Sequence, residues 1–174
     1  PLREGLLRLL MINEGNIEQS NNLLQCPRYH VDAVLDMLTT QHQVVMAGGL
    51  DARLITQWFA DRLRSLRIKQ IFLACDTKEA IKPLRKAVKL LGLKRDKVYC
   101  YVLLKFNPNE TISDATERMI QIWYAGALPF AQLYQPPDRW IDYPLEWRHF
   151  QRTWSRPAAM KAFMKSGSRS ADAE

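Results

Sequence analysis

The segment GGLDAR, at residues 48–53, combines residue types that could hold a polar ligand. Its two glycines, Gly48 and Gly49, allow a ligand to approach the backbone closely. Arg53 could grip a carboxylate through two parallel hydrogen bonds, and Asp51 could orient Arg53 or bind a hydroxyl or ammonium group. The same residues would also make an ordinary strand-to-helix turn with an Asp51–Arg53 surface ion pair. The segment therefore predicts either a ligand site or a polar turn.

Two further sets of polar residues follow apolar runs. Asp76 comes directly after the run IFLAC, where its carboxylate could accept both hydroxyls of a ribose or cap the next helix. Asn21 and Asn22 offer paired amides, and Asn also tolerates left-handed turns. Ligands bind at the carboxyl ends of parallel strands, so we expect these side chains to gather at one rim if the apolar runs are such strands.

Short apolar runs do alternate with stretches of helical period along the chain. The runs recur about every 30 residues, which is the size of one β/α unit. The predicted strands are residues 17–21, 43–47, 70–74, 98–104 and 130–134. The apolar stripes between them are Val31/Val34/Leu35/Leu38, Ile55/Phe59/Leu63/Leu66, Ile81/Leu84/Val88/Leu91 and Ile112/Ala115/Met119/Ile122. This pattern predicts a parallel α/β fold with strands buried on both faces, either an open doubly wound sheet or a barrel.

The helix ends carry recognisable signals. Gly92 and Gly126 follow the third and fourth stripes and predict helix C-termini. Thr111 or Ser113 is expected to cap the fourth helix. The first ten residues, PLREGLLRLL, resemble the body of a helix, and because the chain begins at Pro1 we expect further sequence upstream.

The last third of the chain differs in composition. Residues 135–144 predict a loop, and residues 145–164 predict an aromatic, basic helix broken near Pro157, followed by a disordered tail at 167–174. We divide the chain into a β/α unit at 1–156 and a helical extension with its tail at 157–174. Arg148, Arg152 and Arg156 alternate with aromatic residues, so this helix could bind nucleic acid. Alternatively, Leu145, Phe150 and Trp154 pack inward while the arginines stay in water.

Composition limits the remaining possibilities. The chain has 174 residues, of which 47% are apolar, enough for one folded domain. It has no apolar run of about 18 residues to span a bilayer and no secretory signal, so we expect a cytoplasmic protein. Three dispersed cysteines, Cys26, Cys75 and Cys100, predict neither disulfides nor a metal site. The net charge of +7 allows an anionic partner.

The succession SNNLL, GGLDARLIT, FLACDTKEA and YVLLKFNPNET resembles the radical S-adenosylmethionine (SAM) superfamily of iron–sulfur oxidoreductases. The resemblance extends from about Ile17 to Arg156, and GGLDAR with FLACD are its more specific parts. It implies an incomplete parallel (β/α)6-type barrel of about five β/α units, equivalent to strands two to six of the family's partial barrel.

The resemblance also implies roles for individual residues. The cofactor-binding positions would be Asn21 and Asn22 for the SAM amino group, Gly49, Asp51 and Arg53 near the methionine moiety or the substrate, Asp76 at the ribose, and Leu104 and Phe106 near the adenine. Ser20 stands where relatives often carry an acid. Relatives often have Glu with glycines at the Asp76 position. The loop that in relatives reads G-x-P-G-E-T has Asn107 and Asn109 in place of its glycines.

The family's C-x3-C-x2-C motif, which binds a [4Fe–4S] cluster, is absent from these 174 residues. In the family, that cluster supplies the electron that cleaves SAM reductively to a 5′-deoxyadenosyl radical. We therefore expect the chain alone to be inactive, with the motif either upstream of Pro1 or lost. Two alternatives remain: a non-enzymatic β/α module that binds nucleic acid through Arg148, Arg152 and Arg156, and a barrel enzyme for a phosphorylated metabolite.

Overall fold

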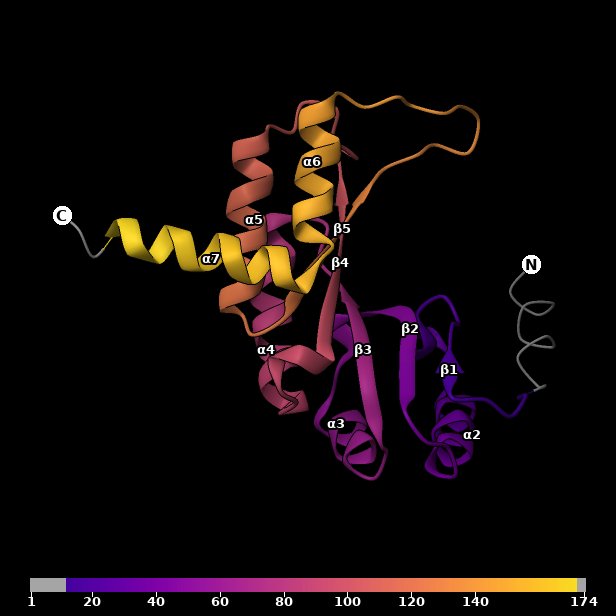
Figure 1. Cartoon of the computed structure of the whole chain (residues 1–174). Coiled ribbons are helices and arrows are strands. Elements are labelled where there is room, and N and C mark those ends of the chain that lie inside the picture. The colour runs from indigo at the N-terminus through magenta and orange to yellow at the C-terminus, as the bar shows by residue number, and fades with distance from the viewer. Residues whose placement is uncertain (1–11, 172–174) are drawn as a thin grey trace.

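The computed structural model describes the backbone of residues 12–171 and the side chains of residues 12–166, so the helix predicted at 1–10 lies outside the described residues. The fold is α/β, with five parallel strands alternating with helices (Figure 1). The strands are β1 (Ile17–Glu18), β2 (Val44–Asp51), β3 (Ile68–Ala74), β4 (Val98–Leu104) and β5 (Leu128–Leu133). The predicted parallel α/β fold is confirmed.

The helices form a layer that follows the order of the chain. They are α2 (Arg28–Thr39), α3 (Gln57–Arg64), α4 (Ile81–Leu91), α5 (Ile112–Tyr124), α6 (Leu145–Trp154) and α7 (Pro157–Ala171). Each helix from α3 to α6 packs beside the next one. Within the described residues, no helix is long and apolar enough to cross a membrane.

The strand order β1-β2-β3-β4-β5 follows the sequence without a reversal. A doubly wound sheet reverses its strand order at a switch point and carries helices on both faces. Right-handed crossovers that always proceed in one direction instead place successive helices on one face. The topology is thus consistent with part of a barrel.

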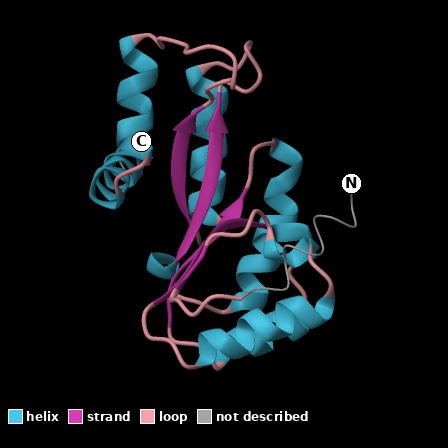
Figure 2. Ribbon diagram, turned by 90° about the vertical axis from the view of Figure 1, so that its right-hand side faces the viewer, coloured by secondary structure: helices cyan, strands magenta, loops and turns pink. Residues whose placement is uncertain are grey.

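The two faces of the sheet differ in burial. Toward the helices the side chains are fully buried, as with Ile71, Leu73, Val98, Cys100 and Val102. The opposite face is only partly covered, and Figure 2 looks onto it. The expectation that the strands are buried on both faces is therefore wrong. Sequence composition misled because the open face also carries aromatic side chains. Phe72 stacks on Tyr99 and Tyr101, and Phe130 meets the rings of Phe72 and Tyr101 edge-on.

The predicted apolar stripes supply most of the core, and local signals end the helices as expected. Thr111 caps α5: its hydroxyl oxygen accepts a hydrogen bond from the Asp114 backbone N–H. The Asp114 carboxylate accepts one from the Thr111 backbone N–H, so the pair forms a capping box. Gly92 follows α4 in the left-handed conformation, at φ 62°. Thr56 caps α3 through a single hydrogen bond, which its hydroxyl oxygen accepts from the Phe59 backbone N–H.

Strand bounds differ from prediction at every strand except β4. β3 begins two residues early, at Ile68, and β5 covers Leu128–Leu133 in place of the predicted 130–134. β1 has two residues, because its parallel pairing with β2 covers only Ile17 and Glu18. The chain then reaches a left-handed turn at Asn22, with φ 60°. β2 continues four residues past the predicted end at Ala47, to Asp51, because the glycines at 48 and 49 remain in the strand. β4 matches its predicted bounds.

The predicted helix break near Pro157 is confirmed, since α6 ends at Trp154 and α7 begins at Pro157. Helix α7 continues to Ala171, so the backbone is helical through most of the segment predicted to be disordered from residue 167. A helix that has already nucleated extends at little cost through Ser, Arg and Ala, and a single Gly is tolerated.

Candidate functional site

A cleft of about 500 Å³ opens at the carboxyl ends of β1, β2 and β3. Among its lining residues are six of the eight predicted site positions, namely Asn21, Asn22, Gly49, Asp51, Arg53 and Asp76. Glu79 adds a third carboxylate from the end of the β3–α4 connection, two residues before α4 begins. The prediction that these polar side chains gather at one rim is confirmed.

Asn22 joins the β1 loop to the end of β2. Its side-chain oxygen accepts a hydrogen bond from the Asp51 backbone N–H at 3.2 Å, and its own N–H bonds to the Gly48 carbonyl at 3.4 Å. Both interpretations of this residue hold together, since Asn22 makes a left-handed turn and also lines the cleft. Its side-chain amide nitrogen makes no hydrogen bond within the described residues.

The two glycines of GGLDAR have separate structural roles. A side chain at Gly48 would collide with the Ser20 carbonyl oxygen, so only glycine lets the β1 loop lie against β2. Gly49 has φ 71°, and a Cβ there would touch the Tyr101 ring at 3.4 Å. The pairing of β2 with β3 shifts register between Met46 and Leu50, which marks this segment as a bulge. Bulges of this kind re-aim the side chains that follow them.

Asp51 and Arg53 form a local ion pair at the mouth of the cleft. The Arg53 Nη2 atom lies 2.6 Å from the Asp51 carboxylate, and Nε lies 3.0 Å from both of its oxygens. Asp51 also accepts a hydrogen bond from the Arg53 backbone N–H. The hydrogen bond from the Arg53 side chain holds the pKa of Asp51 below its ordinary value. The turn interpretation is therefore confirmed, and both residues remain at the cleft.

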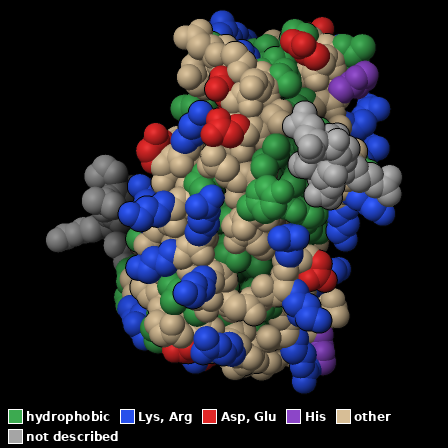
Figure 3. All heavy atoms as spheres, turned by 90° about the vertical axis from the view of Figure 1, so that its left-hand side faces the viewer, with side chains coloured by type: hydrophobic (Ala, Val, Ile, Leu, Met, Phe, Trp, Pro, Cys, Tyr) green, Lys and Arg blue, Asp and Glu red, His purple; other side chains and the backbone are tan. Residues whose placement is uncertain are grey.

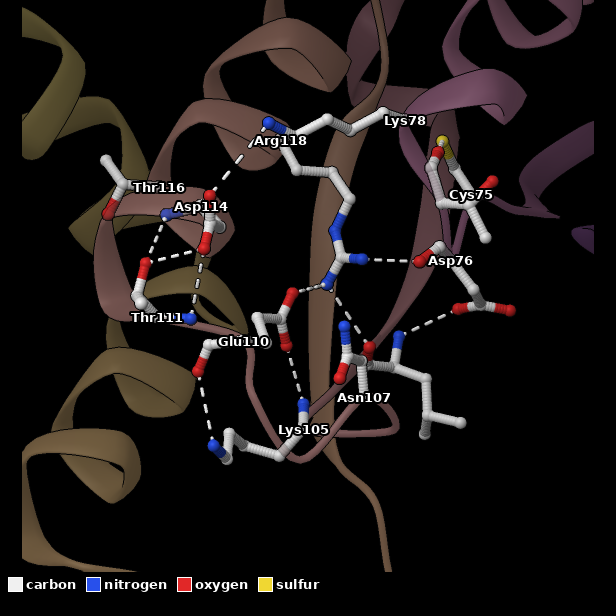
Figure 4. Close-up of polar contacts among 12 residues, drawn as sticks. Cys75, Asp76, Lys78, Lys105, Asn107, Glu110, Thr111, Asp114, Thr116 and Arg118 are labelled. Carbon is white, nitrogen blue, oxygen red and sulfur yellow. Dashed lines mark hydrogen bonds and ion pairs between the residues drawn. The ribbon is translucent and has the colours of Figure 1, made fainter.

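Asp76 does not cap the next helix. One of its carboxylate oxygens accepts a hydrogen bond from the Leu103 backbone N–H at 2.8 Å, which ties the end of β3 to β4. The side chain remains exposed at the cleft, so its second oxygen faces solvent (Figure 4).

Arg118, on α5, is a residue that the sequence interpretation missed. Its guanidinium is buried and donates to the backbone carbonyls of Asp76 and Leu103 and to the Glu110 carboxylate, 2.5 Å away (Figure 4). Glu110 in turn accepts the Lys105 backbone N–H at 2.6 Å. This group, the Arg118 cluster, fastens the ends of β3 and β4 to α5. One sequence signal for its burial was present: Arg118 follows Ala115 by three residues and precedes Met119, so it lies on the same side of α5 as the predicted apolar stripe.

Two of the predicted positions do not line the cleft. Leu104 is fully buried on the helix-facing side of β4. Phe106 is 63% exposed and packs edge-on against Tyr134, with ring centroids 5.1 Å apart. The left-handed backbone at Lys105, with φ 59°, turns the chain away from the cleft between them.

The aromatic residues of α6 face inward. Trp147 and Trp154 are buried, so they are not available to stack on bases. Arg148 lies 3.6 Å from Asp142 in an exposed ion pair, and Arg152 and Arg156 are exposed. The inward packing predicted for Trp154 is confirmed, and Phe150 is partly buried against the core. The same prediction is wrong for Leu145, which is 59% exposed at the first residue of α6. A nucleic-acid contact by the three arginines stays a prediction.

The described residues do not fit an iron–sulfur cluster. Cys75 and Cys100 are buried, and burial raises the pKa of the Cys100 thiol well above its ordinary value. Cluster ligands are thiolates, which burial disfavours. Over residues 12–166, no group of three or more His, Cys, Asp or Glu side chains is placed to hold a metal ion.

Glu18 is a buried carboxylate outside the cleft. Its Oε1 atom accepts the Ser20 N–H at 2.6 Å, and its Oε2 atom has no partner among the described residues. Burial raises the pKa of Glu18, although the hydrogen bonds from Ser20 oppose that shift. The hydrogen bond to the Ser20 backbone fixes the start of the loop that follows β1.

Comparison of the chain with protein-family models, with curated proteins and with solved structures found no match. The functional argument therefore rests on the cleft and its residues.

Proposed function

We propose that the cleft binds SAM, and that the chain is the SAM-binding portion of a radical SAM iron–sulfur enzyme built on an incomplete (β/α)6-type barrel. The observation that carries the proposal is the meeting of Asn22, Asp51 and Asp76, from three successive parallel strands, at one cleft. The sheet order, which follows the chain without reversal, supports the barrel.

The charges of the cleft complement those of SAM. SAM carries a positive sulfonium, a positive ammonium and a negative carboxylate. The cleft presents three carboxylates, from Asp51, Asp76 and Glu79, and one guanidinium, from Arg53. Opposite charges at close range favour such a zwitterion over a neutral nucleoside.

Each residue has a hydrogen-bonding capacity left for the ligand. Asp76 uses one oxygen for Leu103, so the other can accept a ribose hydroxyl. Arg53 uses Nε and Nη2 for Asp51, which leaves Nη1 for the SAM carboxylate. Asn21 and the amide nitrogen of Asn22 lie beside them. Leu104 and Phe106 do not line this cleft, so the proposal does not assign them to the adenine.

The proposal gives this chain binding and orientation of SAM. The family's cluster supplies an electron to the sulfonium, and the cysteines described above do not fit that cluster. The oxidoreductase step is accordingly proposed for the complete enzyme and not for these residues alone.

Isothermal titration of the 174-residue chain with SAM tests the proposal. We expect saturable binding that Asp76→Asn weakens about tenfold or more, because a hydrogen bond to a charged group is lost. Asn keeps an oxygen for the Leu103 N–H, so the fold should persist. Asp96→Asn is the matched control, because exposed Asp96 precedes β4 at the opposite edge of the sheet.

S-adenosylhomocysteine provides a second comparison, since it lacks the sulfonium charge and should bind more weakly than SAM. The proposal fails if SAM shows no saturable binding. It fails equally if Asp76→Asn and Asp96→Asn bind SAM with the same affinity as the unmodified chain.

A further inference from the structure

Helix α4 carries four basic residues on one exposed stripe. Lys82, Arg85, Lys86 and Lys89 are spaced at i, i+3, i+4 and i+7, which places them on a single helix face. All four are exposed, while Ile81, Leu84, Ala87 and Leu91 occupy the buried side. Their combined charge of +4 exceeds half of the protein's formal net charge of +7.

These four residues have no acidic partner among the described residues. The neighbouring helices differ, since their basic side chains are paired with acids. Examples are Arg28 with Asp32, Arg62 with Asp36, Arg64 with Asp61, and Lys78 with Glu117. Helix α4 itself contains no Asp or Glu. Like charges at these spacings repel one another, so the stripe destabilises its own helix unless an anion covers it.

The stripe borders a hollow beside the cleft. This hollow, of about 320 Å³, is lined by Arg53, Lys82 and Lys86 with an apolar floor of Ala52, Ile55 and Pro83. Ala52, Arg53 and Pro83 also line the cleft, so the hollow and the cleft adjoin. Figure 3 shows the helix-covered side of the molecule, where Lys and Arg side chains outnumber Asp and Glu.

We propose that the exposed stripe of α4 binds the phosphodiester backbone of a nucleic acid. A row of unpaired cations one helix face wide matches a row of regularly spaced phosphates better than it matches a single small anion. The helix surface offers no exposed aromatic residue, so the contact reads phosphates and not bases. The surface differs from the α6 arginines, of which Arg148 is already paired with Asp142. The proposal does not depend on SAM.

The test measures binding of the intact chain to a labelled single-stranded DNA of about 16 nucleotides by fluorescence anisotropy at several salt concentrations. Replacing three lysines, as Lys82→Gln, Lys86→Gln and Lys89→Gln together, should weaken binding at low salt about tenfold or more. The slope of log affinity against log salt should become less negative by about 2. Gln is a good helix former, and the relief of repulsion should keep or raise the melting temperature.

Two matched variants make the test specific. Arg148→Gln, Arg152→Gln and Arg156→Gln together remove the same charge from the other basic surface and should change the affinity far less. Replacing the three α4 lysines by Arg keeps the charge and should preserve binding.

Four results would overturn the proposal. These are absence of DNA binding by the unmodified chain, equal losses from the two triple Gln variants, loss of binding in the Arg variant while it stays folded, and displacement of the DNA by polyglutamate at equal charge concentration. Equal losses would indicate attraction by net charge, and displacement by polyglutamate would indicate an acidic protein as the partner.

Discussion

The carboxyl edge of the sheet has an open half and a closed half, and each half contains one acid–arginine pair. In the open half, over β1 to β3, Asp51 pairs with Arg53, whose side chain is 74% exposed. In the closed half, over β4, Glu110 pairs with Arg118, and each side chain is 9% exposed. Both ion pairs are close, but one is exposed to solvent and the other is buried, so they have different structural roles.

The difference lies in what else each arginine holds. Arg53 contacts Asp51, two residues away, and ties no distant segments together. Arg118 reaches across to the carbonyls of Asp76 and Leu103, so it joins α5 to the ends of two strands. The closed half thereby fixes Asp76, which faces the open half. One half of the edge thus positions the residues that the other half presents to a ligand.

The largest expected effect comes from breaking the closed half. Arg118→Met should lower the free energy of unfolding by about 3 to 5 kcal/mol, because it leaves the Glu110 carboxylate buried without its partner. Urea denaturation followed by circular dichroism measures the change. Adding Glu110→Gln to Arg118→Met should recover part of the loss. If the double variant is as unstable as the sum of both single variants, the pair is not coupled and the comparison fails.

A smaller effect is expected from the bulge that shapes the open half. Gly48→Ala should cost about 1 to 3 kcal/mol, because its Cβ would force the Ser20 backbone away from β2. Thermal denaturation tests this, with Gly15→Ala as the control, because a Cβ at Gly15 meets no atom within 4 Å. Similar melting temperatures for the two variants would show that the β1 loop does not require glycine at position 48.

The smallest effect on stability is expected from Arg53→Met. Near neutral pH, the free energy of unfolding should fall only slightly, because exposed ion pairs contribute little. The pKa of Asp51, now below its ordinary value, should rise toward that value when the Arg53 hydrogen bond is removed. A carboxyl group with a lowered pKa stabilises the fold above its unfolded pKa and loses that contribution as the pH falls through the folded pKa.

The small difference in stability between the unmodified chain and Arg53→Met should therefore be fully present above the pKa of an ordinary Asp, and it should disappear as the pH falls through the pKa of Asp51 in the folded chain. NMR titration of the Asp51 carboxyl group measures the shift directly. An Asp51 pKa that does not move would mean that the Arg53 backbone N–H, and not the Arg53 side chain, lowers the pKa of this carboxyl group.

Much of the open half could be predicted from sequence. GGLDAR and the acid after FLAC stand directly after apolar runs, and parallel strands carry such residues to a common edge, so Asn22, Asp51 and Asp76 were placed together correctly. Leu104 and Phe106 could not be placed in the same way. The chain changes direction between them at Lys105, which has a positive φ. Lys is not a residue type that favours this conformation, so the sequence did not predict the turn there.

By itself the sequence determined the alternation of strands and helices, the caps at Thr111 and Gly92, and the basic stripe of α4, because each depends on contacts within a few residues. The tertiary structure alone decided the unreversed strand order, the burial of Arg118 against the ends of β3 and β4, and the lack of an acidic partner for the basic stripe of α4 among the described residues. These features depend on contacts between segments far apart in the chain, where the free energy comes from burial and charge pairing that no local pattern specifies.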